Sequence, residues 1–185
     1  VEIIQTRGVS PGFDRDPRKS VPRVMAFAVP FGWILKPKDF EKGLSVAVTK
    51  IKRISPDSVD PKIKNYHWLD FVSGMFEAYD KNKNTAILVD QDNNILEGPG
   101  FNIFFVKKMT LYTPKKGVLE GITRGAVLKI AKELKIPVYF NSMSKKKLKL
   151  CDEVFVTSTA GGIMPITNID GKLINGGKVG SVTKR

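Results

Sequence analysis

The stretch that decides the fold reads L-E-G-I-T-R and occupies residues 119–124. Downstream, apolar residues recur at the spacing of one face of an amphipathic helix, namely at Ile122, Ala126, Val127, Ile130, Ala131 and Leu134. A glycine directly precedes this helix, so backbone N–H groups of residues 121–123 should be free at its positive end, where anions bind. The alternative is an ordinary helix start at which Thr123 caps its own backbone.

A second stretch, T-S-T-A-G-G at residues 157–162, supports the anion-binding interpretation. It follows a strand-like apolar run at residues 154–156, and it offers three hydroxyls and two glycines at the end of that strand. Two loops rich in hydroxyl and amide groups could hold the two sides of a single phosphate.

Length and composition predict one globular domain. The chain has 185 residues, of which 42% are hydrophobic and 26% charged. It contains no apolar run of about 18 residues, so we expect no membrane partner. Its single cysteine, Cys151, excludes an internal disulfide and a multi-cysteine metal site, and it suits a reducing compartment such as the cytoplasm.

A net charge of +13 raises the question of a nucleic-acid partner. The lysines are scattered along the chain, and the only dense cluster is Lys145, Lys146 and Lys147 with Lys149. Dispersed lysines favour a solvated surface, so we do not expect nucleic acid to be bound.

The element pattern is that of an α+β domain, because short strands outnumber helices. Besides the helix from Ile122, we expect one helix with an apolar stripe at Trp68, Leu69, Val72, Met75, Phe76 and Tyr79. Residues 9–22 should form a long loop, and Ser144 should cap a short basic turn that runs through Leu150. Strands are expected at residues 1–6, 23–29, 44–48, 51–54, 85–89, 95–97, 102–106, 111–113 and 153–157.

Few residues remain that could perform catalysis. The chain has one histidine, no paired cysteines, no G-x-G-x-x-G and no Walker loop, so no metal site or Ser-His-Asp triad is predicted. A lysine with a lowered pKa could form an imine, and Glu97, beside glycines, could pair with a protonated ring nitrogen. Phosphate, imine lysine and ring-nitrogen carboxylate together specify pyridoxal phosphate (PLP). Taken alone, Lys64 and Glu97 favour plainer interpretations, as a surface lysine and a solubilising strand end.

At this point the sequence resembles the class IV (branched-chain and D-amino acid type) PLP-dependent aminotransferases, and most of all the (R)-selective amine transaminases. The resemblance runs from Glu2 to Lys184. D-P-K-I-K-N-Y-H-W, residues 60–68, resembles the catalytic-lysine segment, with Lys64 rather than Lys62 in the Schiff-base position. The choice follows from Glu97, which lies 33 residues after Lys64, as in the family.

The resemblance also implies roles for the other motifs. In E-G-P-G-F-N, residues 97–102, Glu97 would hold the pyridine nitrogen and Asn102 would brace the site. Residues 119–124 would place Leu119 under the ring and the N–H groups of Ile122 and Thr123 on the phosphate, and Ser158 and Thr159 would form a second phosphate loop. The implied substrate pocket comprises Trp68, Gly100, Phe101 and Ala160.

The fold that the resemblance implies is the large C-terminal domain of the family, a mixed-sheet pseudo-barrel with packed helices, spanning residues 1–185. The implied activity is transamination between an amine or amino acid and a keto acid through Lys64, in a protein that is a homodimer when complete. The family's small N-terminal domain and terminal helix have no counterpart here, so we expect a fragment. Neither Arg7 nor Arg15 matches the family's phosphate arginine, so the pocket should be open on one side.

Other functions remain open. Branched-chain aminotransferase, D-amino acid aminotransferase and aminodeoxychorismate lyase are alternatives within the same fold. A catalytically inactive fragment that binds a ligand or nucleic acid is the alternative of another class.

Overall fold

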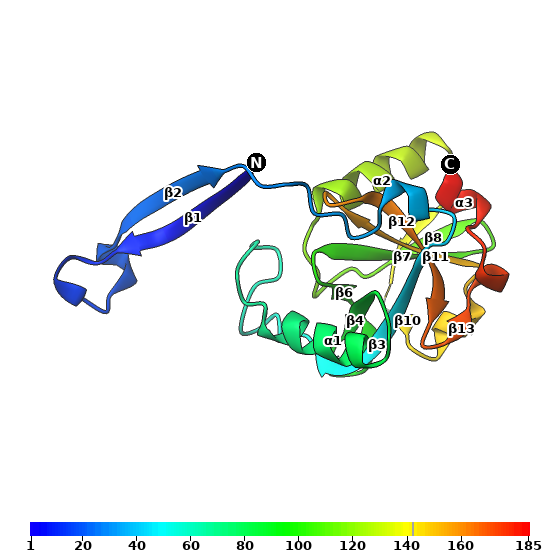
Figure 1. The fold of residues 1–185 in the computed structure, drawn as a ribbon, viewed down its shortest axis with the longest axis horizontal. Coiled ribbons are helices and arrows are strands. Elements are labelled where there is room, and N and C mark those ends of the chain that lie inside the picture. The colour runs from blue at the N-terminus through cyan, green and yellow to red at the C-terminus, as the bar shows by residue number, and fades with distance from the viewer. Residues whose placement is uncertain (142) are drawn as a thin grey trace. The chain divides into compact units, whose positions relative to one another are not determined.

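The computed structural model describes residues 1–141 and 143–185, which form two compact units, Val1–Gly32 and Trp33–Arg185. The first unit is an antiparallel hairpin of β1 (Glu2–Val9) and β2 (Val21–Phe27), in which Glu2 pairs with Phe27. Two 3₁₀ turns, η1 (Pro11–Phe13) and η2 (Pro17–Lys19), lie in the predicted long loop (Figure 1). The expectation of a single domain over residues 1–185 stays a prediction.

The second unit is built on an 11-stranded mixed sheet of described residues, which confirms the α+β prediction. Strand pairs β12/β3, β3/β4 and β8/β9 are parallel and the others antiparallel. The main path is β10 (Met143–Ser144), β5 (Asn94–Ile95), β4 (Thr85–Val89), β3 (Leu44–Lys52), β12 (Gly162–Ile169), β11 (Glu153–Ser158), β7 (Phe101–Lys107), β8 (Thr110–Thr113) and β9 (Val138–Phe140). Two short strands branch from it, since β6 (Glu97–Gly98) pairs with β7 and β13 (Lys172–Leu173) with β12.

Both faces of this sheet are apolar because successive side chains of a strand alternate between them. One face carries the largest core cluster, to which β3, β4, β7, β11 and β12 all contribute. The other face is covered by helices: α1 (Leu69–Asp80) packs on β3 and β4, and α2 (Ile122–Glu133) packs on β7 and β11 (Figure 1). The remaining helical segments are η3 (Pro37–Asp39), η4 (Lys147–Leu150), η5 (Asn175–Gly177) and α3 (Ser181–Lys184). None of the helices in the described residues is both long and apolar enough to cross a membrane.

Three expectations need correction. The two strands expected at 44–48 and 51–54 are one strand, β3, which ends at Lys52 and whose pairing with β4 is irregular between Val48 and Lys52, where the Lys50 N–H donates to Glu77 instead. The apolar stripe expected on α1 is mainly exposed, and the helix buries Phe71, Gly74 and Ala78 instead. Ser144 lies in β10 and caps nothing, since Lys146 is the N-cap of η4. Within the basic cluster, the side chain of Lys149 lies outside the described part of the structure.

The carboxylate of Glu153 anchors α3 to the sheet. It accepts hydrogen bonds from the backbone N–H groups of Val182 (3.0 Å) and Thr183 (2.8 Å) and from the Thr183 hydroxyl (2.7 Å). Gly180 permits this approach, because a Cβ there would lie 1.8 Å from the carboxyl carbon. We expect Glu153→Ala to lower the free energy of unfolding by about 3 kcal/mol, because buried donors lose a charged acceptor.

Urea unfolding followed by circular dichroism measures this loss. The control is Lys184→Ala, which removes only an exposed ion pair with Glu41 (2.8 Å) and should cost less than about 1 kcal/mol. Equal losses in the two variants would contradict the anchoring role.

Candidate active site

One cavity of about 340 Å³ is lined by Arg53 and by four segments that are far apart in the sequence. They are the loop before α1, the turn between β6 and β7, the segment that enters α2, and the end of β11. The cavity brings together every residue that the sequence predicted for the site except Ala160: Lys64, Trp68, Glu97, Gly100, Phe101, Asn102, Leu119, Ile122, Thr123, Ser158 and Thr159. Its size is within the range of small-molecule sites.

Glu97 presents a buried carboxylate to this cavity. Its Oε2 accepts hydrogen bonds from the Leu119 N–H (2.9 Å) and from Asn102 Nδ2 (3.3 Å), while Asn102 Nδ2 also donates to the Leu119 carbonyl (2.8 Å). Burial raises the pKa of Glu97, and the Leu119 N–H and the neighbouring Arg53 oppose that rise. Gly98 next to it has no room for a side chain, since a Cβ would lie 2.3 Å from the Ala86 carbonyl oxygen.

The N-terminus of α2 forms another wall of the cavity and is free to bind an anion. Its N-cap is Gly121, and no side chain caps the described first turn, so the alternative in which Thr123 caps its own backbone is wrong. Gly121 is required by close packing, because a Cβ there would lie 2.3 Å from Asn102 Oδ1. Uncapped N–H groups at the positive end of a helix favour a phosphate or carboxylate.

Arg124, in the same first turn, is buried and fixes where α2 begins. Its Nη2 donates to the Pro114 carbonyl (2.8 Å) and its Nε to the Thr113 hydroxyl (3.4 Å). Burial lowers the pKa of Arg124, opposed by Glu120 and Glu97. The guanidinium therefore ties the start of α2 to the end of β8.

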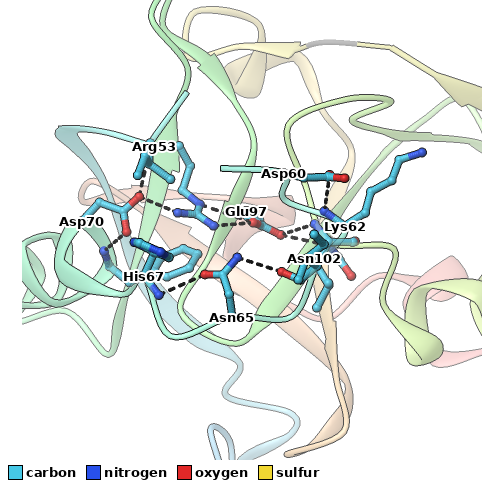
Figure 2. A network of polar contacts seen from close by, with 12 residues as sticks. Arg53, Asp60, Lys62, Asn65, His67, Asp70, Glu97 and Asn102 are labelled. Atoms are coloured by element: carbon cyan, nitrogen blue, oxygen red, sulfur yellow. Dashed lines mark hydrogen bonds and ion pairs between the residues drawn. The ribbon is translucent and has the colours of Figure 1, made fainter. Parts of the chain in front are cut away.

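The loop at residues 60–68 holds two lysines with different surroundings. Asn65 shapes it, since Asn65 Nδ2 donates to the Ile63 carbonyl (2.8 Å) and Asn65 Oδ1 accepts from the His67 N–H (2.9 Å). Lys64 lines the cavity, whereas Lys62 does not and forms an exposed ion pair with Glu120 (3.1 Å). Figure 2 shows the Lys62 side chain extending away from the Arg53–Glu97 pair.

The end of β11 contributes three hydroxyl residues, which differ in exposure and in hydrogen bonding. The Ser158 hydroxyl donates to the Gly100 carbonyl (2.7 Å) and accepts from the Ala160 N–H (3.1 Å), so it ties two cavity turns together. Thr159 is exposed at the cavity, and the buried Oγ1 of Thr157 has no hydrogen-bond partner among the described residues. The phosphate roles of Ser158 and Thr159 stay predictions.

Sequence reasoning missed the cation beside Glu97. Arg53 follows β3 and reaches Glu97 Oε1 through Nε (3.3 Å) and Nη2 (3.2 Å), while its Nη1 contacts Asp70 Oδ2 (2.5 Å) (Figure 2). The one available signal was an arginine next to an apolar strand end, which does not reveal its partner.

The chain's one cysteine takes no part in the cavity. Cys151 packs against the main core cluster, and its burial raises the pKa of the thiol to about 11. No group of three or more His, Cys, Asp or Glu side chains suited to a metal ion occurs in the described residues.

The sequence matches the model of the family Amino-transferase class IV over residues 3–169. The chain belongs to the class IV aminotransferases. It is 36% identical to the branched-chain-amino-acid aminotransferase of Escherichia coli K12 over 165 residues, which cover 88% of the chain and 53% of that enzyme. This class IV chain therefore spans about half the length of that curated relative.

Solved structures give the same family. The branched-chain aminotransferase of the archaeon Thermoproteus uzoniensis, crystallised with norvaline, matches with a TM-score of 0.85 and 32% identity over 95% of the chain and 58% of that structure. The T.th. branched-chain amino acid aminotransferase with pyridoxamine 5'-phosphate matches with a TM-score of 0.77 and 30% identity, over 81% of the chain and 51% of that structure.

Proposed function

We propose that this class IV chain carries the cofactor-binding part of a PLP-dependent transaminase that moves an amino group between an amine or amino acid and a keto acid. The observation that carries the proposal is the convergence of a lysine, a buried carboxylate and an uncapped helix N-terminus in one cavity. The names of the relatives and the pyridoxamine 5'-phosphate complex of one of them support it.

The residues of the cavity fit this cofactor on chemical grounds. The uncapped N–H groups of Ile122 and Thr123 suit its phosphate, with Ser158 and Thr159 opposite them. Glu97 suits a protonated ring nitrogen, Asn102 holds the Glu97 carboxylate, and Leu119 would support the ring. The orphaned hydroxyl of Thr157 at the same wall is consistent with a polar ligand.

In the proposed reaction the bound PLP supplies a carbonyl that captures amines and a ring that accepts electron density. Lys64 would hold the cofactor through its amine and, when that amine is free, would move the proton at the substrate carbon. Glu97 would hold a proton on the ring nitrogen. The same two residues would serve the keto acceptor in the reverse direction.

We propose an amino acid as donor, because the relatives with solved structures are named for branched-chain amino acids. Trp68, Gly100, Phe101 and Ala160 would form the side of the pocket that contacts the substrate. The aromatic pair Trp68 and Phe101 favours a second candidate, an (R)-selective amine transaminase. Turnover of L-leucine against an aromatic (R)-amine distinguishes the two candidates.

A single-turnover experiment on the chain tests the function. The protein is loaded with PLP and mixed with each amino donor, and keto acid and pyridoxamine phosphate are measured by mass spectrometry. We expect one equivalent of each per loaded chain, at a rate well above that of free PLP under the same conditions. Binding of PLP without keto acid above the free-PLP rate would favour the catalytically inactive ligand-binding alternative.

A further inference from the structure

At the cavity wall lie three largely buried charges in a row, Asp70, Arg53 and Glu97, of which Arg53 and Glu97 line the cavity; neither the motifs nor the proposed reaction uses the three as a unit (Figure 2). Their side chains are 13%, 10% and 5% exposed, respectively. Charges removed from water are costly unless they are paired. Each of these three charges is therefore stabilised by its neighbour in the row.

Arg53 is held in one orientation from two further sides. Asp70 Oδ2 accepts from Arg53 Nη1 (2.5 Å) and also from the Ile54 N–H (2.9 Å), which fixes the anchor itself. The guanidinium carbon lies 3.9 Å from the centre of the Phe71 ring, in cation–π geometry. Nε and Nη2 are thereby left to converge on the same oxygen of Glu97.

Four donors contact the Glu97 carboxylate, and three of these contacts are long, at 3.2–3.3 Å, so its oxygens can still accept a further hydrogen bond. Oε1 receives Arg53 twice, and Oε2 receives the Leu119 N–H and Asn102 Nδ2. Within the described residues, Arg53 is the one cation among these donors. The amide donors alone direct the carboxylate without supplying a charge.

Burial and charge act on Glu97 in opposite directions. Burial raises the pKa of Glu97, the Leu119 N–H and Arg53 lower it, and Asp70 on α1 raises it again. The other charged groups at the cavity wall are Arg124 from α2, Glu120 from the segment that enters α2, and Lys64 from the loop before α1, which also carries the titratable His67. Without Arg53, the Leu119 N–H would be the main group left to oppose desolvation, so the pKa of Glu97 would rise further.

We propose that Arg53, anchored by Asp70 and Phe71, is a positioning residue that keeps the Glu97 carboxylate ionised and aimed along the cavity wall. This proposal rests on the proposed function in one respect only, namely that the negative charge of Glu97 holds a proton on a ring nitrogen. The ionisation state of Glu97 is a property of the protein without any cofactor, so it can be measured separately.

The first measurement is a ¹³C NMR titration of the Glu97 carboxyl in the cofactor-free chain, assigned by its loss in Glu97→Gln. We expect Arg53→Gln, which keeps an amide donor but no charge, to raise the titration midpoint by about 1 pH unit or more, which is a tenfold change in the ratio of ionised to protonated carboxyl at a given pH. Arg53→Lys keeps the charge and should recover more than half of that shift. A midpoint that is unchanged in Arg53→Gln, or equal in Arg53→Gln and Arg53→Lys, would overturn the proposal.

Folding of each variant is checked by circular dichroism, and Arg53→Met replaces Arg53→Gln should the latter fail to fold.

The second measurement is the pH dependence of turnover in the loaded chain. Because a raised pKa leaves Glu97 ionised only at higher pH, the acid limb of the profile should move to higher pH in Arg53→Gln, and activity should return as the pH rises. A loss that is equal at every pH would show a merely structural role. Absence of turnover in the parent chain would count against the proposed function and leave the titration result intact.

Discussion

Lys64→Ala is expected to abolish covalent attachment of PLP and to lower turnover by about 10³-fold or more, since proton transfer by a positioned side chain contributes about 10²–10⁴-fold. Lys64 lines the cavity that also contains Glu97 and the start of α2. We propose that its amine reaches the carbonyl of a cofactor held at both of those points.

Lys62→Ala is the matched control for this prediction. Lys62 lies two residues away in the same loop but does not line the cavity; its amine is paired with Glu120, and both side chains are about two thirds exposed. Such an exposed pair contributes little, so the control variant should retain the covalent label.

Borohydride reduction followed by peptide mapping measures the label in each variant. We expect the pyridoxyl group on Lys64 in the parent chain and in Lys62→Ala, and no labelled lysine in Lys64→Ala. A label found on Lys62 in the parent chain would contradict the assignment of Lys64 as the reactive amine. Because the same peptide contains both residues, fragment ions between positions 62 and 64 decide between them.

The contrast between α2 and α1 shows which parts of the fold were predictable from the sequence. The helix beginning at Ile122 was predicted correctly, because apolar periodicity and a preceding glycine coincide there. Its buried face was predicted only in part, since Ile122 is 84% exposed while Arg124 is buried against Thr113 and Pro114. Which polar side chain finds a buried partner depends on contacts that are distant in the sequence.

Helix α1 has apolar residues on two faces, and the pattern alone could not indicate which one packs on the sheet. Close approach decided it, because Gly74 lets the helix lie so near β4 that a Cβ there would be 2.8 Å from the Leu88 side chain. The larger side chains of Leu69, Phe76 and Tyr79 are left exposed.

In the candidate site, too, local motifs were predictable from the sequence, whereas contacts between distant residues were not. The resemblance to the family predicted the residues that meet at the cavity, because each of the motifs that carry it is local in the sequence. Arg53 and Asp70 belong to no motif, and the contact of Arg53 with Glu97 joins residues 44 positions apart. That pairing becomes visible only when β3 and β6 are placed together.

Glu97→Gln is expected to leave PLP bound and to slow transamination by at least about 10²-fold, the effect typical of removing one well-placed electrostatic group. Binding should persist, because the uncapped N-terminus of α2 and Lys64 are unaltered. The amide has nearly the shape of the carboxylate, but it carries no negative charge with which to hold a proton on the ring nitrogen.

Glu120→Gln is the matched control for Glu97→Gln, because it makes the same chemical change at the same cavity wall. Glu120 is 65% exposed and paired with Lys62, so its charge is screened by water and its loss should alter turnover less than about threefold. Single-turnover rates, together with PLP affinity from fluorescence titration, separate slowed chemistry from weakened binding.

Glu97→Asp completes the test of the Glu97 charge. It restores the charge but withdraws the carboxylate by one methylene, so turnover should lie between those of the parent and of Glu97→Gln. Circular dichroism must show all three variants folded, because removal of one partner from a buried ion pair can itself destabilise a protein by about 3–5 kcal/mol. A folded Glu97→Gln variant that binds PLP and turns over at the parent rate would exclude Glu97 as the partner of the ring nitrogen. The charge that Arg53 maintains there would then serve only the packing of β6 against the entrance of α2.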